Sequence, residues 1–432
     1  MIKKLIESRR THLGPNYSLH FDNPLYLTKS KDQYLYDYKE KKYLDAIGNI
    51  NIVGHCNNHV IKSIFNQSSL LNTNTRYLYD IMESYSKKLL KYFPKELSVI
   101  YFVCSGSEAN DLALRIANNF TNGNNYLVID NAYHGHTSSL IDLSPYKFNN
   151  TGGHGKKPFV HILDMPDPIR GKYRYDKKDW INGYIEDSKN MINKIFSNNK
   201  YKLSAFFSES ILGCGGQVVL PPNYLSEIFN LVRYYGGLCI SDEVQTGFGR
   251  VGDNFWAFEN QNIIPDICTL GKPMGNGHPI SAVITTKKIA ASFNNGMEYF
   301  NSFGGNPVSL AAGNAVLEVI EKEKLQNNAL LVGNYLKDNL CKLKIKYPSK
   351  IIDIRGEGLF LGIDLVKDSN PNLPDSDLAK FIINNSKELG VILGIDGPNN
   401  NVIKIKPPLI FNKENSDFLC DCIEKSILLY NK

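Results

Sequence analysis

Residues 237–250 read GLCISDEVQTGFGR, a short apolar run followed at once by Asp242 and Glu243. The run is typical of a buried strand, and strand interiors disfavour Asp and Glu. A buried carboxylate is costly unless it is hydrogen-bonded or paired with a cation. The two acidic residues therefore indicate that a cation lies near the end of this strand.

Six further apolar runs resemble this one, and helical patterns separate most of them. They read LSVIYFVC (97–104), YLVID (126–130), FVHIL (159–163), LSAFFS (203–208), DICTL (266–270) and ISAVITT (280–286). Apolar runs without alternation, joined by crossover helices, are typical of a parallel sheet covered on both faces. The sequence therefore predicts an α/β fold with a mostly parallel seven-stranded sheet between helices.

The pattern differs outside this central region. Residues 1–55 are short, mixed segments, whereas residues 308–432 contain long helices, the strand-like segments IIDIRGEGLFLGIDLV and NVIKIKPPLIF, and a last helix. We expect a large domain over residues 56–307. Residues 1–55 and 308–432 are expected to form a smaller α+β domain.

Composition excludes several functions. The 432 residues are 42% hydrophobic and carry a modest net charge of +6, with Lys and Arg scattered along the chain, so we expect no nucleic-acid partner. No run of about 18 apolar residues predicts a membrane span. Eight cysteines at irregular spacing indicate reduced thiols and a cytoplasmic location. Cys420 and Cys422 point to different faces of a predicted helix, so we expect no metal site.

In an open α/β sheet, ligands bind beyond the carboxyl ends of the strands. One candidate there is CSGSEANDLALRIANNF (104–120), in which Ser105 and Glu108 fit a capping box. The helix then begins at Gly106 and Ser107, where free amides and the helix dipole favour a phosphate. The alternative is an ordinary capped helix.

Three other groups follow strands. Tyr133 and His134 in NAYHGHT (131–137) offer a flat face for a planar ligand, although buried aromatic residues are commoner. Glu209 closes the strand LSAFFS. Lys272 in LGKPMGNGHP (270–279) follows another strand, where a solvated surface lysine is the usual interpretation.

Together these groups are the parts that hold pyridoxal 5′-phosphate: a phosphate site, an aromatic plate, a strand-end Asp and a Lys 30 residues after it (272 − 242 = 30). Over nearly its whole length the chain resembles the class III aminotransferases, which are fold type I pyridoxal-phosphate enzymes. The segments SDEVQTGFGR and GKPMGNG carry the resemblance most specifically.

The resemblance implies roles around the cofactor ring. Asp242 pairs with the protonated ring nitrogen, Val244 packs on the ring face, and Gln245 binds the ring hydroxyl oxygen. Lys272 forms the Schiff base with the cofactor and, once displaced by substrate, serves as the general base. Glu243 points to the other side of the strand, where a structural role is expected.

The resemblance also implies a homodimer with shared active sites. Gly106 and Ser107 match the phosphate turn, and Tyr133 matches the ring-stacking aromatic residue, with His134 beside it. In NSFGGNP (301–307), Ser302 stands where the family usually has Thr, and this segment completes the phosphate site of the neighbouring subunit.

Within the family, the chain is most similar to phospho-lyases that act on ethanolamine phosphate and phosphohydroxylysine. The segments LLNTNTRYL, SPYKF, ESILGCGGQ, GRVGDNFWAFE, GNGHP, GMEYFN and IDGPNNNVIKIKPPL carry this likeness. Thr246 departs from it, because the phospho-lyases have Val there and aminotransferases commonly have Thr. An amine:2-oxo-acid aminotransferase is therefore the alternative, and a non-catalytic cofactor-binding scaffold is a distant one.

Two residues on the substrate side leave the reaction open. Many aminotransferases of this class carry Arg where IKIKPPL has Lys404, and that Arg alternates between a Glu and a substrate carboxylate. Lys lacks the guanidinium fork but keeps a charge that suits phosphate. Glu209 and Lys404 are a candidate gate for the primary amine substrate, and a structural Glu and a surface Lys are the alternative.

Overall fold

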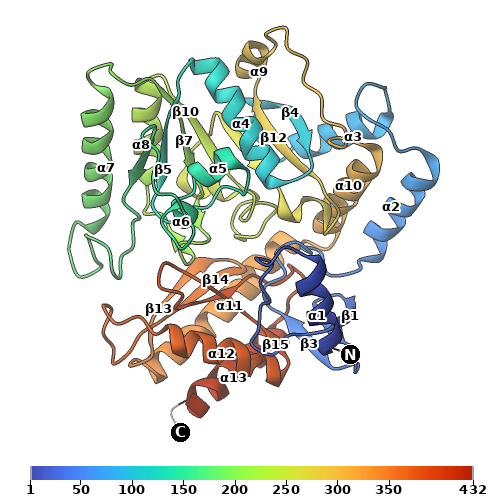
Figure 1. The fold of residues 1–432 in the computed structure, drawn as a ribbon, viewed down its shortest axis with the longest axis vertical. Helices are drawn as coiled ribbons and strands as arrows, with labels where there is room; N and C mark the ends of the chain where they lie inside the picture. Colours follow the sequence, from blue (N-terminus) through green and yellow to red (C-terminus); the bar gives the residue numbers. More distant parts are fainter. Residues whose placement is uncertain (1, 431–432) are drawn as a thin grey trace.

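The structure is a computed structural model that describes residues 2–430. Its centre is a seven-stranded sheet in which only β12 runs antiparallel to its neighbours (Figure 1). The predicted α/β fold with a mostly parallel sheet is confirmed. From one edge to the other, the strands are β4 (Leu97–Val103), β12 (Ser281–Thr286), β11 (Ile267–Leu270), β10 (Leu238–Asp242), β7 (Leu203–Ser208), β5 (Asn125–Ile129) and β6 (Val160–Leu163).

Helices cover both faces of this sheet, as expected for strands without polar alternation. Successive residues of one strand enter different cores: Phe206 packs with residues of α7 (Trp180–Phe196) and α8 (Tyr224–Tyr234), and Phe207 packs with α4 (Gly106–Thr121). Side chains alternate along a strand, so each face needs its own cover. The carboxyl ends of the parallel strands stay open at one edge, next to the start of α4.

The two ends of the chain meet below this sheet (Figure 1). The N-terminal strands β1 (Leu27–Lys31), β2 (Tyr34–Asp37) and β3 (Lys42–Asp45) join β15 (Val391–Ile392), which pairs with β3. We infer that both ends build one smaller α+β unit. Its other elements are the antiparallel sheet β13 (Ile351–Glu357), β14 (Phe360–Leu365), β17 (Val402–Ile405) and β16 (Gly394–Asp396), and the helices α11 (Leu325–Lys346), α12 (Ser376–Leu389) and α13 (Lys413–Tyr430).

One helix of the predicted C-terminal domain packs on helices of the predicted large domain. The helix α10 (Pro307–Lys322) packs on α2 (Asn58–Leu70) and α3 (Asp80–Leu90), beside the large sheet. Most of its side chains are buried, so it is a core helix of the part that contains the seven-stranded sheet. We therefore propose that the smaller unit begins after α10. The remaining elements are α1 (Ile2–His12), α5 (Ser138–Asp142), α6 (Pro145–Phe148), β8 (Ile211–Leu212), β9 (Val218–Val219), α9 (Lys287–Phe293) and the 3₁₀ helices η1 (Ala257–Gln261) and η2 (Lys272–Gly275).

Within residues 2–430, no helix is both long and apolar enough to cross a membrane. The same residues contain no group of three or more His, Cys, Asp or Glu arranged to hold a metal ion. Cys420 and Cys422 are buried on α13 as free thiols. Where the protein resides in the cell stays a prediction.

Candidate active site

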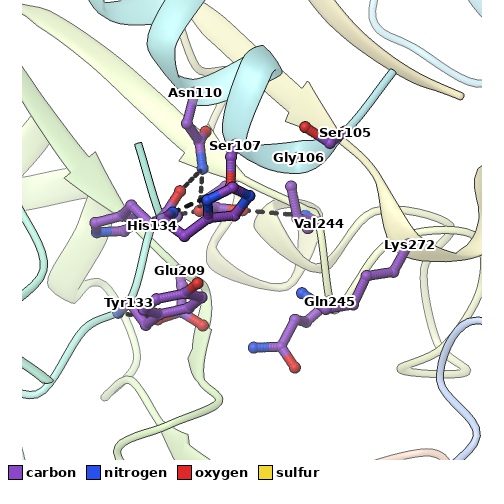
Figure 2. Close-up of a pocket in the computed structure, with 13 residues that line it drawn as sticks. Ser105, Gly106, Ser107, Asn110, Tyr133, His134, Glu209, Val244, Gln245 and Lys272 are labelled. Carbon is purple, nitrogen blue, oxygen red and sulfur yellow. Dashed lines mark hydrogen bonds and ion pairs between the residues drawn. The ribbon is translucent and has the colours of Figure 1, made fainter. Parts of the chain in front are cut away.

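A cavity of about 260 Å³ lies where the strand ends meet the start of α4 (Figure 2). It brings together most of the residues that the sequence singled out, although β4, β5, β7, β10 and β11 deliver them from distant parts of the chain. Its walls are formed by Ser105, Gly106, Ser107, Asn110, Tyr133, His134, Gly135, His136, Glu209, Asp242, Val244, Gln245 and Lys272.

The start of α4 forms one wall. Ser105 Oγ accepts a hydrogen bond from the Glu108 amide at 3.1 Å, while Glu108 Oε2 accepts one from the Cys104 amide at 3.1 Å. The first amides of the helix have no acceptor within it, which favours an anion there. A Cβ on Gly106 would lie 2.6 Å from Val244 Cγ1, so only glycine lets the helix start so close to β10.

Asp242 lies at the end of β10 and is 5% exposed. Its Oδ2 accepts hydrogen bonds from Asn110 Nδ2 at 2.8 Å and His134 Nδ1 at 2.9 Å, and Oδ1 accepts one from the Val244 amide at 3.1 Å. Among residues 2–430, no Lys or Arg forms an ion pair with this carboxylate. The cation that the sequence predicted beside Asp242 is therefore one that a ligand can supply.

His134 and Asn110 hold the carboxylate of Asp242 by hydrogen bonds. The His134 ring, expected as part of a flat face, is buried and bonded to the carboxylate, and Asn110 Nδ2 also donates to the His134 carbonyl at 2.7 Å. Sequence reasoning missed Asn110. Its signal is a polar residue one turn into α4, next to the apolar positions Ala109 and Leu112, where it is 1% exposed.

Tyr133 stands at the opposite side of the cavity from Lys272 (Figure 2). Its ring meets that of Tyr146 edge to face, with centroids 6.1 Å apart, and Lys147 Nζ lies 5.7 Å from the Tyr133 centroid. Burial raises the pKa of the Tyr133 hydroxyl. The Tyr133 ring thus packs against Tyr146, keeps its hydroxyl proton, and has the ammonium of Lys147 over one face.

Lys272 follows β11 at the start of η2, and its side chain extends into the cavity (Figure 2). It is exposed to the cavity, yet protein atoms surround it, and this desolvation lowers the pKa of its amine. Asp242 opposes that shift, whereas Lys404 adds to it. The result is an amine that loses its proton more readily than an ordinary lysine, as a nucleophile requires.

Glu209 and Lys404 form no ion pair within the described residues. Glu209 is 3% exposed and accepts hydrogen bonds from the amides of Tyr133 at 3.3 Å and Gly213 at 3.1 Å, and burial raises its pKa. Lys404 Nζ lies 2.7 Å from Asp396 Oδ2. Lys404 and Asp396 are diagonal neighbours on the paired strands β17 and β16, which explains the choice of partner.

Lys406 is the second residue that the sequence reasoning missed. It is 1% exposed and donates a hydrogen bond to Gln245 Oε1 at 2.7 Å. It lies two residues after Lys404, and alternation along an extended segment puts both on one side. The repeated Lys in IKIKPPL was therefore the signal.

Ser302 and Glu243 lie outside the cavity walls. Ser302 is exposed in the turn before α10. Glu243 is fully buried and accepts hydrogen bonds from Thr246 Oγ1 and from the amides of Ala257 and Phe258, while burial raises its pKa to about 7. Its side chain thus anchors η1 to the end of β10.

The donor set suits a flat, phosphorylated cation. A buried carboxylate without a Lys or Arg partner lies at one end, a helix N-terminus forms one wall, and Val244, Tyr133 and Lys272 line the space between them. Pyridoxal 5′-phosphate carries a ring nitrogen that suits the carboxylate of Asp242 and a phosphate that suits the helix N-terminus. It also carries an aldehyde that can react with the amine of Lys272. The fold and the cavity together define an enzyme that holds such a cofactor.

Comparison with known proteins supports the assignment to pyridoxal-phosphate enzymes. The family described as Aminotransferase class-III matches residues 17–427, so the chain belongs to the class III aminotransferase family. It is a pyridoxal 5′-phosphate-dependent enzyme that acts on an amine substrate.

Its relatives carry names of two kinds. The chain is 45% identical to "Alanine--glyoxylate aminotransferase 2-like" of Drosophila melanogaster, over 95% of this chain and 84% of that one. It is 39% identical to "Ethanolamine-phosphate phospho-lyase homolog 1" of Caenorhabditis elegans, over 100% of this chain and 94% of that one. A solved phospholyase from Arthrobacter in complex with phosphoethanolamine matches with a TM-score of 0.92 and 36% identity, over 98% of this chain and 99% of that one.

Proposed function

We propose that this enzyme eliminates phosphate from an O-phosphorylated primary amine of the ethanolamine phosphate type. Water is consumed, and the products are an aldehyde, ammonia and inorganic phosphate. One observation carries the proposal: Lys404 and Lys406 share the single carboxylate of Asp396, at 2.7 and 3.9 Å, and Lys404 is close enough to Lys272 to lower the pKa of its amine. This excess of positive charge suits a phosphate dianion better than a monovalent carboxylate.

The type of cation supports the same substrate. An arginine binds a carboxylate with two parallel hydrogen bonds, whereas a lysine acts as a point charge that phosphate accepts equally well. The names of the Caenorhabditis elegans and Arthrobacter proteins add support. We therefore assign Lys404 to the substrate phosphate, with Asp396 as its partner when the substrate is absent.

The residues around the cofactor have the following proposed roles. Bound pyridoxal phosphate supplies an electron sink for the carbanion at the substrate carbon next to nitrogen. Asp242 holds a proton on the ring nitrogen, and Gly106 and Ser107 bind the cofactor phosphate. Lys272 Nζ would hold the cofactor covalently and, once the substrate amine has displaced it, would remove the proton from that carbon. The electron pair left on that carbon would form a double bond to the next carbon as the carbon–oxygen bond there breaks, and the electron pair of the broken bond would leave with the phosphate.

An amine:2-oxo-acid aminotransferase is the second candidate. The same proton removal by Lys272 serves both reactions, because they diverge only at the next step. Thr246 favours this alternative, since aminotransferases commonly have Thr where the phospho-lyases have Val. The Drosophila relative, at 45% identity, carries an aminotransferase name.

One incubation separates the two reactions. The holoenzyme is mixed with ethanolamine phosphate without any 2-oxo acid, and inorganic phosphate and acetaldehyde are measured. Release of both over many turnovers is expected for the lyase. If phosphate is not released and the cofactor is converted once to its amine form, an aminotransferase is the correct assignment.

Replacing Lys404 by methionine is expected to raise the KM for ethanolamine phosphate about 10-fold to 100-fold, the loss of one charge-assisted hydrogen bond. A smaller change in kcat is expected, because Lys404 does not contact the reacting carbon. Steady-state kinetics with Lys404→Arg, which keeps the charge, and Lys425→Met, an exposed lysine on α13, provide the comparison. An unchanged KM in Lys404→Met would contradict the assignment.

We also propose that two chains form a dimer in which Ser302 of each completes the other's cofactor phosphate site. Large apolar side chains lie exposed near this turn and on α2 and the loop after it: Phe65 at 69%, Leu78 at 102% and Phe303 at 72%. Such a surface is typical of one covered by a partner. A second copy of this chain is the occupant that the exposed Ser302 turn favours.

Sedimentation of the holoenzyme is expected to give twice the mass of one chain. Leu78→Asp is expected to give the mass of a single chain and to weaken cofactor binding, because the partner's Ser302 is lost. Leu331→Asp changes an exposed leucine on α11 and is the matched control. A wild-type enzyme that sediments as one chain at micromolar concentration would rule out the shared site.

A further inference from the structure

We propose that Lys406 is a positioning residue that orients the side-chain amide of Gln245, so that Nε2 and not Oε1 faces the cofactor ring oxygen. The inference rests on the proposed contact between Gln245 and that oxygen. Lys406 itself does not touch the cofactor in this proposal. Lys406 acts by binding Oε1 of Gln245, which leaves Nε2 to face the cofactor.

The hydrogen bond to Lys406 removes the ambiguity of the amide. A glutamine amide has one accepting end and one donating end, and a lysine ammonium only donates. Lys406 Nζ lies 2.7 Å from Gln245 Oε1, so Nε2 must point elsewhere. In Figure 2 the Gln245 nitrogen points toward the side of the cavity that carries Tyr133.

Two neighbours hold the rest of Gln245. Asn49 Nδ2 donates to the Gln245 carbonyl at 3.3 Å, which fixes the main chain. On the other side, a Cβ on Gly213 would lie 2.5 Å from Gln245 Nε2, so the absence of a side chain at Gly213 leaves room for the amide. The side chain therefore has one place to lie, and Lys406 determines its orientation there.

Two contacts of Lys406 favour its charged form, against the effect of burial. Its Nζ lies 3.9 Å from Asp396 Oδ2 and 4.1 Å from the centroid of the Phe360 ring, and both stabilise an ammonium. Burial and the nearby charges of Lys404 and Lys272 oppose them and lower the pKa of Lys406. Asp396 acts against this lowering and raises the pKa of Lys406, as well as serving as the partner of Lys404.

The orientation has a spectroscopic consequence. With the cofactor bound through Lys272, its visible absorbance would change with pH as the lysine nitrogen loses its proton. A donor on the ring oxygen stabilises its anionic form and so lowers the pH midpoint of that change. An amide turned the other way would put two oxygens against each other and raise the midpoint.

The test is a double-mutant cycle read by absorbance against pH. Lys406→Met and Gln245→Leu are each expected to raise the midpoint by about 1 unit, the size of one hydrogen bond to a charged group. Combined, they are expected to raise it no further than Gln245→Leu alone. Cofactor dissociation constants, measured by adding pyridoxal phosphate to the apoenzyme, are expected to show the same non-additivity.

Lys404→Met is the matched control, because it removes a positive charge beside the same Asp396 without touching Gln245. Its effect on the midpoint is expected to add fully to that of Gln245→Leu. If the shift from Lys406→Met also adds fully, Lys406 acts through its charge alone and the proposal is wrong. It is equally wrong if Gln245→Leu shifts the midpoint and Lys406→Met does not.

Two further results keep the outcome clear. If Lys406→Met does not fold, as judged by thermal unfolding of the apoenzyme, Lys406→Arg retains a donor and is expected to keep the wild-type midpoint. A shift in Lys406→Arg as large as that in Gln245→Leu would overturn the proposal. If Gln245→Leu itself causes no shift, the proposed contact with the cofactor fails, and the role of Lys406 fails with it. None of these measurements depends on the reaction catalysed.

Discussion

Replacing Lys272 by alanine is expected to lower turnover of the holoenzyme by about 10⁴-fold, because one amine is proposed to be both nucleophile and general base. The amine lies in the cavity with its pKa lowered by burial, and Asp242 is the carboxylate that opposes this lowering most. No other lysine lines the cavity within the described residues. Lys404 and Lys406 are engaged with Asp396 and Gln245, so neither is placed to take over.

The measurement combines kinetics with covalent labelling. Borohydride reduction is expected to attach the cofactor to Lys272 in the wild type, seen by peptide mass, and to leave Lys272→Ala unlabelled. Lys287→Ala is the matched control, since Lys287 also follows a strand of the same sheet, β12, but is exposed outside the cavity. Labelling of any other lysine in the wild type would show that the assignment is wrong.

Replacing Asp242 by asparagine is expected to lower kcat/KM by about 10³-fold, within the range for losing a preorganised charge at the reacting group. The negative charge that would hold the proton on the ring nitrogen is lost. The hydrogen bonds also become mismatched, because His134 Nδ1, Asn110 Nδ2 and the Val244 amide all donate to this carboxylate. An asparagine must turn its own NH₂ group toward at least one of these donors.

Glu243→Gln is the informative comparison, because it changes the adjacent carboxylate of the same strand end. Glu243 binds Thr246 and the amides of Ala257 and Phe258, away from the cavity. The substitution Glu243→Gln is expected to lower the melting temperature, while turnover per folded holoenzyme stays within about 3-fold of the wild type. If Asp242→Asn behaves the same way, Asp242 has no role at the ring nitrogen.

The large sheet was predictable because its signal is local. Each of its strands is a short apolar run that needs cover on both faces, and all seven runs became strands. The boundary of the smaller unit was harder to predict. The helix α10 continues the sequence pattern of the C-terminal helices, but its apolar surface packs on α2 and α3. A helical pattern does not say which partner buries it.

The candidate site divides in the same way. Residues at strand ends and helix starts could be found, since backbone geometry assigns their places. Asn110 and Lys406 could not, because their importance lies in bonds to Asp242 and Gln245, which are 132 and 161 residues away in the chain. The partner of Lys404 was likewise decided by the pairing of β16 with β17, which makes Asp396 its neighbour instead of Glu209.

The sequence by itself determined the fold class from its apolar runs, and the family and the cofactor from the resemblance that SDEVQTGFGR and GKPMGNG carry, because these patterns lie within short stretches of the chain. Only the tertiary structure decided that His134 and Asn110 bond to Asp242, that Lys404 pairs with Asp396, and that Lys406 donates to Gln245. The physical reason is that hydrogen bonds and ion pairs act over about 3 Å in space, whatever the separation along the chain. Their partners are known only once the sheets have brought the side chains together.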